Sequence, residues 1–183
     1  TDDTGIYERT SSGWHVVATG IPNARLGITS RTGDGWFYTA RDEIGWIQLT
    51  PEGLATRRIP APGLGDVYHH AVDGTGAVWA ELGSSRVARI RFPSGLPPVV
   101  QILTTEQGLT DGWVQIFVID GVARFNLPAL VLRYDESSNR FLEDDDFLRR
   151  HPAMRNSVGR PIKDPRGNIW FSTGGSVHRI TPE

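Results

Sequence analysis

One phrase recurs along this chain of 183 residues at nearly constant spacing. Residues 162–173 read IKDPRGNIWFST, and residues 28–39 read ITSRTGDGWFYT, which aligns with them without a gap. A third copy, AVDGTGAVWAEL, occupies residues 71–82, and a copy shorter by one residue, VIDGVARFN, occupies residues 118–126. The aromatic residue of each copy follows the previous one after 43, 46 and 45 residues. The ungapped columns and the regular spacing identify the chain as a repeat protein.

The period separates strand-based repeats from helical ones. Repeats of about 40–50 residues built from short strands are typical of propeller blades, whereas helical repeats of similar length need long amphipathic helices. No such helix is indicated, because 21 Gly and 12 Pro interrupt the chain and its apolar runs are short. The sequence therefore predicts an all-β fold, a β-propeller made of four-stranded antiparallel blades.

Each copy of the phrase predicts the hairpin between the two inner strands of a blade. A Gly in the turn tolerates the positive φ that a tight hairpin requires. The aromatic that follows is large enough to fill the space between blades. The predicted turn glycines are Gly33, Gly76, Gly121 and Gly167. The predicted buried wedges are Trp36, Trp79, Phe125 and Trp170.

The strand pattern predicts one propeller region over residues 1–183 with about four blades. Runs of two, four, four, four and three strands are expected in chain order. They form a partial blade at 4–19, blades at about 25–62, 66–105 and 112–148, and an incomplete blade at 156–183. We interpret this count as an arc of a larger ring. Such an arc leaves apolar blade faces open, so we expect self-association through these faces as one kind of partner.

Composition excludes several classes of function. The net charge of −2 carries no basic surface for nucleic acid. No apolar run approaches the ~20 residues of a membrane span, so this segment is expected to make no membrane contact. The chain has no Cys, and its His residues lack metal-ligand spacing. The acidic run 143–146 lacks the spaced oxygen ligands of a calcium loop and is expected to be a solvated edge on an outer strand or its loop. We expect no metal and no cofactor.

Residues 105–183 resemble the two-component regulator propeller repeat. The phrase DPRGNIWFSTGGSVHRITP carries the family's pattern at Asp164, Gly167, Trp170, Thr173 and Arg179. The resemblance implies seven-bladed rings in the periplasmic sensing region of hybrid histidine kinases, often for carbohydrates. It implies a non-catalytic sensor of a two-component system, on the periplasmic or extracellular side of a bacterial membrane, with any kinase elsewhere in the full-length protein.

The first half resembles the streptogramin-lyase propellers instead. DGTGAVWAE carries their blade pattern at Asp73, Trp79 and Glu81. The resemblance implies a His that acts with a metal ion to open a lactone. Here His69 and His70 lie on an inner strand, but the matching columns of the next blade hold Ile116 and Phe117. We therefore predict no catalytic residue and keep the lyase as an alternative.

A ligand site is expected where long connections join one blade to the next. These connections are residues 60–68, 103–113 and 149–157. Tyr68, His69 and Trp113 lie at the ends of the first two, so they are predicted to line one pocket at the channel mouth. An exposed Trp there can stack on a sugar ring, which leaves a propeller lectin as a further alternative. The expected ligand is a small molecule or a carbohydrate.

Overall fold

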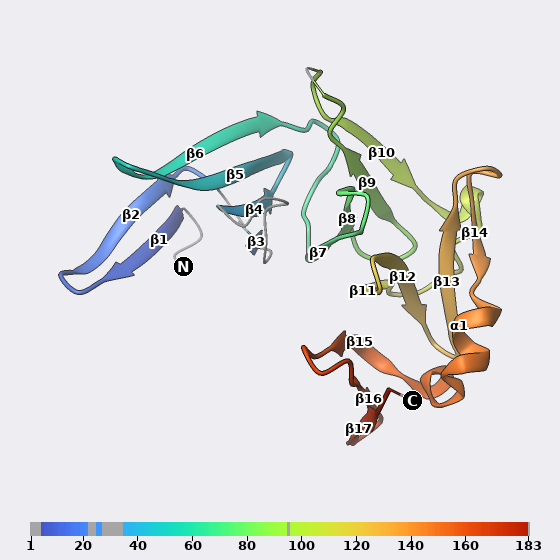
Figure 1. Cartoon of the computed structure of the whole chain (residues 1–183). Helices are drawn as coiled ribbons and strands as arrows, with labels where there is room; N and C mark the ends of the chain where they lie inside the picture. Colours follow the sequence, from blue (N-terminus) through green and yellow to red (C-terminus); the bar gives the residue numbers. More distant parts are fainter. Residues whose placement is uncertain (1–4, 22–24, 27–34, 95, 183) are drawn as a thin grey trace. The chain divides into compact units, whose positions relative to one another are not determined.

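A computed structural model describes residues 5–21, 25–26, 35–94 and 96–182 (Figure 1). Seventeen strands account for most of the described chain, and neighbours within each sheet are consecutive in the sequence and antiparallel. The chain divides into two compact units, Thr1–His70 and Ala71–Glu183. Each unit is described by itself.

The first unit contains a two-stranded sheet followed by a four-stranded one. The strands are β1 (Gly5–Thr10), β2 (Gly13–Thr19), β3 (Arg25–Leu26), β4 (Gly35–Ala40), β5 (Glu43–Thr50) and β6 (Gly53–Pro60). The β3–β6 sheet is the first blade. Its Tyr38, Ala40 and Ile47 form a buried cluster with Ile6 of β1 and Ile21, so the two sheets pack face to face.

The second unit contains three further blades, of four, four and three strands. The first strand of the second blade, β7, crosses the boundary between the two units. The second blade is β7 (His69–Val72), β8 (Val78–Glu81), β9 (Val87–Arg91) and β10 (Val99–Leu103). The third is β11 (Gln115–Ile119), β12 (Val122–Leu127), β13 (Leu130–Asp135) and β14 (Arg140–Glu143). The fourth is β15 (Val158–Lys163), β16 (Ile169–Thr173) and β17 (Ser176–Ile180). This series of sheets confirms the predicted all-β blade organisation, while the size of the ring stays a prediction.

Short helices occupy two of the connections between blades. The 3₁₀ helix η1 (Thr105–Gln107) precedes the third blade, and α1 (Asp145–Arg150) and the 3₁₀ helix η2 (Pro152–Asn156) precede the fourth. The acidic run 143–146 was expected to be a solvated edge on an outer strand or its loop, and this holds for the exposed Glu143, Asp145 and Asp146 but is wrong for Asp144. Asp144 is buried, accepts a hydrogen bond from the Phe147 N–H as the N-cap of α1, and pairs with Arg124 at 2.8 Å. A carboxylate at this position is favoured because it satisfies free N–H groups of the first turn.

The hairpins of the second and fourth blades match bond for bond. In each, the backbone carbonyl of the Asp accepts from the turn Gly, at 3.0 Å for Asp73 and Gly76 and at 2.9 Å for Asp164 and Gly167. The two glycines have φ of 83° and 85°, as their turn requires. The second carboxylate oxygen of each Asp accepts from the indole of the repeat Trp, at 2.7 Å in the second blade and 2.9 Å in the fourth. The Asp therefore connects the turn to the wedge. The copy at residues 28–34, including Gly33, lies outside the described residues.

The third blade uses a different turn, which reverses the direction of its aromatic. Asp120 and Gly121 both have positive φ, 55° and 74°, so two residues close the hairpin. Because side chains alternate along a strand, the missing residue turns Phe125 toward the preceding blade instead of the following one. Trp79 and Phe125 then meet edge to face across one interface, with ring centroids 5.0 Å apart. Both residues are buried, but they face each other from two successive blades. They therefore do not occupy equivalent positions in the repeat.

Burial of the repeat aromatics between sheets is confirmed for Trp79 and Phe125 and is wrong for Trp36. Trp79 and Phe125 are buried, whereas Trp170 is half-buried. Trp36 is 40% exposed, because it lies beside Tyr38 on the face toward β1–β2 and near the end of its strand. Phe37, on the opposite face, is buried and packs on the ring of His70 instead.

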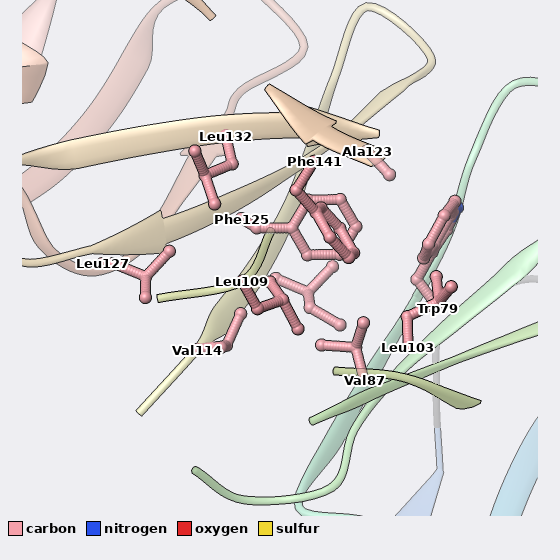
Figure 2. Close-up of a cluster of buried hydrophobic side chains, with 11 residues drawn as sticks. Trp79, Val87, Leu103, Leu109, Val114, Ala123, Phe125, Leu127, Leu132 and Phe141 are labelled. Carbon is pink, nitrogen blue, oxygen red and sulfur yellow. The ribbon is translucent and has the colours of Figure 1, made fainter. Parts of the chain in front are cut away.

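Two hydrophobic cores hold the second unit together. Figure 2 shows the first, in which Trp79, Val87 and Leu103 of the second blade meet Phe125 and Phe141 of the third. The second core joins the third blade to the fourth through α1. Its members are Phe117, Ile119, Val131, Phe147, Leu148, Met154, Ile169 and Phe171. No helix among the described residues has the length and apolar character needed to cross a membrane.

Candidate functional site

The three residues predicted to bind ligand lie in different units. Tyr68 is exposed just before β7, and His69 is a half-buried residue of that strand. Trp113 lies in the second unit, just before β11, and is 43% exposed. The common pocket of all three stays a prediction.

Trp113 lines a pocket of its own between the third and fourth blades. The pocket encloses about 290 Å³. Its lining residues are Trp113, Gln115, Asn126, Leu127, Pro128, Ser157, Val158 and Gly159. Trp113 and Ser157 end the connections 103–113 and 149–157, Pro128 lies in the turn between β12 and β13, and the other five lie on β11, β12 and β15 beside them. These are the kinds of connection at which the sequence predicted binding.

The loop that carries Trp113 is fastened to the second blade. The backbone of Trp113 forms an isolated antiparallel bridge with Ser84. Ser85 donates its backbone N–H to the Gly112 carbonyl at 2.8 Å. On the other side, the buried Val114 belongs to the core between the second and third blades. Trp113 is thus presented by a held backbone, which is the arrangement that a binding residue on a rigid scaffold requires.

A bulge in β15 shapes the opposite wall. Val158 pairs with Ser172 and Ile162 with Trp170, so β15 carries extra residues between these two pairs. Gly159, with φ of 88°, is one of them. Bulges bend a strand and redirect its side chains.

Asn126 fastens the bulged strand to the third blade. Its buried Nδ2 donates to the carbonyls of Ser157 and Gly159, at 3.2 and 3.0 Å. These bonds fix two lining residues of the fourth blade against β12. They also leave Asn126 Oδ1 as an acceptor at the pocket.

The chemistry of the pocket is neutral. None of the eight lining side chains carries a charge. Trp113 and Val158 are exposed apolar surfaces, and Gln115 and Asn126 supply amides. Ser157 is buried, and its Oγ has no hydrogen-bond partner among the described residues. A buried hydroxyl without a partner is costly.

Glu81 and Arg160 form an ion pair that no pattern in the sequence predicted. Glu81 is fully buried on β8 and accepts the Ile116 backbone N–H of β11 at 2.6 Å. The Arg160 guanidinium binds both carboxylate oxygens, with Nε 2.9 Å from Oε1. Arg160 is one of the extra residues of the β15 bulge. The sequence marks Glu81 as the acidic residue that follows Trp79 in the repeat. It does not indicate Arg160 as its partner, because only the bulge in β15 brings Arg160 close to Glu81.

His70 is a structural residue in its own unit. Its Nδ1 lies 3.0 Å from Thr39 Oγ1, and its ring packs edge-on against Phe37. Burial, and to a lesser extent the neighbouring His69, lowers the pKa of His70 to about 4. The ring is therefore neutral at ordinary pH. Among the residues that the structure describes, no three His, Asp or Glu side chains come together as metal ligands.

Solved structures similar to this chain are propellers of the lyase type. Virginiamycin B lyase from Staphylococcus aureus superposes with a TM-score of 0.59 at 16% identity, over 98% of this chain and 63% of that one. A catalytically inactive variant of that enzyme with quinupristin matches with a TM-score of 0.53 at 18% identity, over 100% of this chain and 71% of the other. This chain thus spans about two thirds of their length. No protein-family model and no curated protein matches it. The likeness establishes the propeller fold, and the resemblance to the two-component repeat stays a prediction.

Proposed function

We propose that this chain is a non-catalytic ligand-binding region of a propeller, and that it binds a small uncharged molecule between its third and fourth blades. The observation that carries the proposal is the exposed Trp113 side chain in an uncharged pocket that the amide residues Gln115 and Asn126 also line. Ligand pockets combine apolar surface with a few well-placed polar groups. This pocket has both.

A sugar is the ligand class that fits these groups best. The C–H face of a sugar ring packs on an aromatic face, as exposed Trp side chains allow. Its hydroxyls both donate and accept, so they can pair with the amides of Gln115 and Asn126. A charged ligand would find no opposite charge on the lining side chains.

The location of the pocket also supports a sensing role. A ligand there would touch Trp113 of the third blade and Val158 of the fourth, so it would stiffen the contact between two blades. Such a change is what a sensor region of a two-component protein would transmit. The periplasmic or extracellular location belongs to the same proposal.

Binding can be tested by calorimetry with a panel of neutral hexoses and their disaccharides, beside glucuronate and glucosamine as charged counterparts. We expect binding to neutral sugars only. Trp113→Ala should weaken it at least about tenfold, or about 1.4 kcal/mol.

Trp36→Ala is the matched control, since Trp36 has nearly the same exposure as Trp113 and does not line the pocket. It should leave binding unchanged. Failure of every neutral sugar to bind, or equal binding by Trp113→Ala, would refute the proposal.

A lyase is the second candidate, because the similar structures are virginiamycin B lyases and the alignments cover nearly all of this chain. The test is incubation with quinupristin in the presence of Mg²⁺, followed by chromatography. Opening of the ring that depends on protein concentration and is lost in His69→Ala would establish the lyase and replace the binding role. An intact antibiotic after prolonged incubation would remove this candidate.

A further inference from the structure

The two walls of the Trp113 pocket belong to different sheets. Gln115 on β11 is part of the wall from the third blade, and Val158 and Gly159 on β15 are part of the wall from the fourth. Both strands lie within the second unit. The width of the pocket therefore depends on what holds β11 and β15 at a fixed spacing.

The bulged part of β15 takes partners from other blades. Its ladder with β16 is interrupted within residues 158–162, and Gly159 and Arg160 lie in the interruption. The Gly159 carbonyl accepts from Asn126 of the third blade at 3.0 Å. The Arg160 guanidinium binds Glu81 of the second blade. The wall from the fourth blade is thus held in part by the blades that precede it.

The same carboxylate also holds the opposite wall. Glu81 Oε1 accepts the Ile116 N–H at 2.6 Å and lies 2.9 Å from Arg160 Nε. The peptide that joins Gln115 to Ile116 is planar, so a fixed Ile116 N–H also fixes the Cα of Gln115. On the other side, Gly159 joins Arg160 through one peptide. Each wall therefore has a residue directly next to a group that Glu81 binds.

The burial of the acceptor makes this connection stiff. Glu81 is fully buried, so water cannot easily replace Arg160 as the partner of its carboxylate. The guanidinium binds both carboxylate oxygens, and such a bidentate pair fixes the orientation of both groups as well as their distance. A connection of this kind can hold two walls at one spacing.

We propose that Glu81 is a positioning residue of the pocket. It does not line the pocket and belongs to the second blade, but it sets the spacing between the walls from the third and fourth blades. Through this spacing it sets the affinity for the ligand. The effect on affinity rests on the proposed function, whereas the effect on spacing does not.

The spacing can be measured without a ligand. The chain has no Cys, so Val158→Cys provides a single thiol for a bimane fluorophore. Trp113 and Val158 line the same pocket, and both are exposed, so the label displaces no buried side chain. An indole quenches bimane at short range. The part of the quenching that disappears in Trp113→Phe therefore reports how close the two walls are.

Glu81→Gln in the labelled chain should lower this quenching, because Arg160 loses its charged partner and the bulge is free to move away from β11. Asp144→Asn is the matched control. It breaks another buried pair of the same unit, with Arg124, keeps an oxygen that can cap α1, and lies outside the pocket lining. It should leave the quenching unchanged. Equal quenching in Glu81→Gln and the unmodified labelled chain would overturn the proposal, and so would an equal fall in Asp144→Asn.

Two variants of Arg160 approach the pair from its other end, and they also decide the matter if Glu81→Gln does not fold. Arg160→Gln removes the charge and should lower the quenching. Arg160→Lys keeps the charge and should retain more of the quenching, although it loses the bidentate geometry. Unchanged quenching in Arg160→Gln would overturn the proposal, as would equal losses in the two variants.

Affinity is measured by calorimetry with a neutral sugar that the unmodified chain binds. Glu81→Gln should raise the Kd about fivefold, a size of effect known for residues that do not touch the ligand. Asp144→Asn should leave the Kd unchanged. An unchanged Kd in Glu81→Gln would overturn the proposed effect on affinity. If no neutral sugar binds the unmodified chain, the proposed function fails, and the quenching still decides whether Glu81 sets the spacing.

Discussion

At the scale of single residues, His70 shows how burial sets a protonation state. The ring is enclosed by Phe37 and Thr39, and its Nε2 has no partner among the described residues. Protonation would place a charge in this apolar site, and for that reason the pKa of His70 falls from 6.5 to about 4. The same burial makes His70 unsuited to bind a ligand at the surface.

The pH dependence of stability follows from this shift. An unfolded His binds a proton below pH 6.5, whereas the folded His70 does so only near pH 4. The stabilisation is therefore complete above about pH 6.5 and decreases as the pH falls to about 4, by roughly 2–3 kcal/mol. Urea unfolding at a series of pH values should show this decrease. It should be smaller in His70→Gln and unchanged in His15→Gln, whose side chain is exposed. Equal slopes for His70→Gln and the unmodified chain would contradict the assignment.

At the scale of elements, the Asp of the repeat determines the hairpin more than the Gly does. Asp73 accepts from Thr75, Ala77 and the Trp79 indole, and Asp164 holds the same set of positions. The Trp170 indole and then the Asn168 amide lower the pKa of Asp164 to about 2. A carboxylate is required here because only it accepts on both oxygens.

Asp73→Asn should separate the two functions of this side chain. An amide can still accept the turn N–H groups with its oxygen, but its NH₂ cannot accept from the Trp79 indole. We expect a loss of about 1–3 kcal/mol in the free energy of unfolding, because the buried indole N–H loses its partner. Asp111→Asn, in an exposed loop, should change stability by less than about 0.5 kcal/mol. If Asp73→Asn leaves the free energy of unfolding unchanged, the hydrogen bond from the Trp79 indole contributes nothing to stability.

At the scale of the whole second unit, Glu81 and Arg160 connect the blades. The Glu81 carboxylate belongs to the second blade, accepts from Ile116 of the third, and pairs with Arg160 of the fourth. One buried carboxylate therefore touches three successive sheets. Removing one partner of a buried pair leaves an uncompensated charge, and it costs more than the loss of a surface pair.

Glu81→Gln is the corresponding test. The amide oxygen can still accept the Ile116 N–H, but the Arg160 guanidinium loses its negative partner. Chemical denaturation should show a loss of about 2–4 kcal/mol. Asp146→Asn breaks the exposed pair with Arg149 and should cost less than about 1 kcal/mol. If Glu81→Gln and Asp146→Asn lose the same free energy of unfolding, the Glu81–Arg160 pair contributes no more to stability than an exposed pair.

The sequence predicted the place of the pocket better than the residues that line it. Long connections indicated where the ends of blades meet, and Trp113 was found because an aromatic at a strand entrance is visible in the sequence. Ser157 and Asn126 were missed, because a Ser or an Asn in a loop carries no signal until its neighbours are known. Tyr68 and His69 lie at the end of another connection, residues 60–68, and their role in ligand binding stays a prediction.

What the sequence by itself determined is the repeat: the sheets of two, four, four, four and three strands, and the turns that Asp and Gly close. These depend on backbone preferences and short-range hydrogen bonds, which neighbouring residues encode. Only the tertiary structure decided which face each aromatic occupies. The third hairpin is one residue shorter, and a change of one residue moves a side chain to the other face of its strand. It also decided that Arg160 reaches Glu81, because this contact joins residues far apart in the chain.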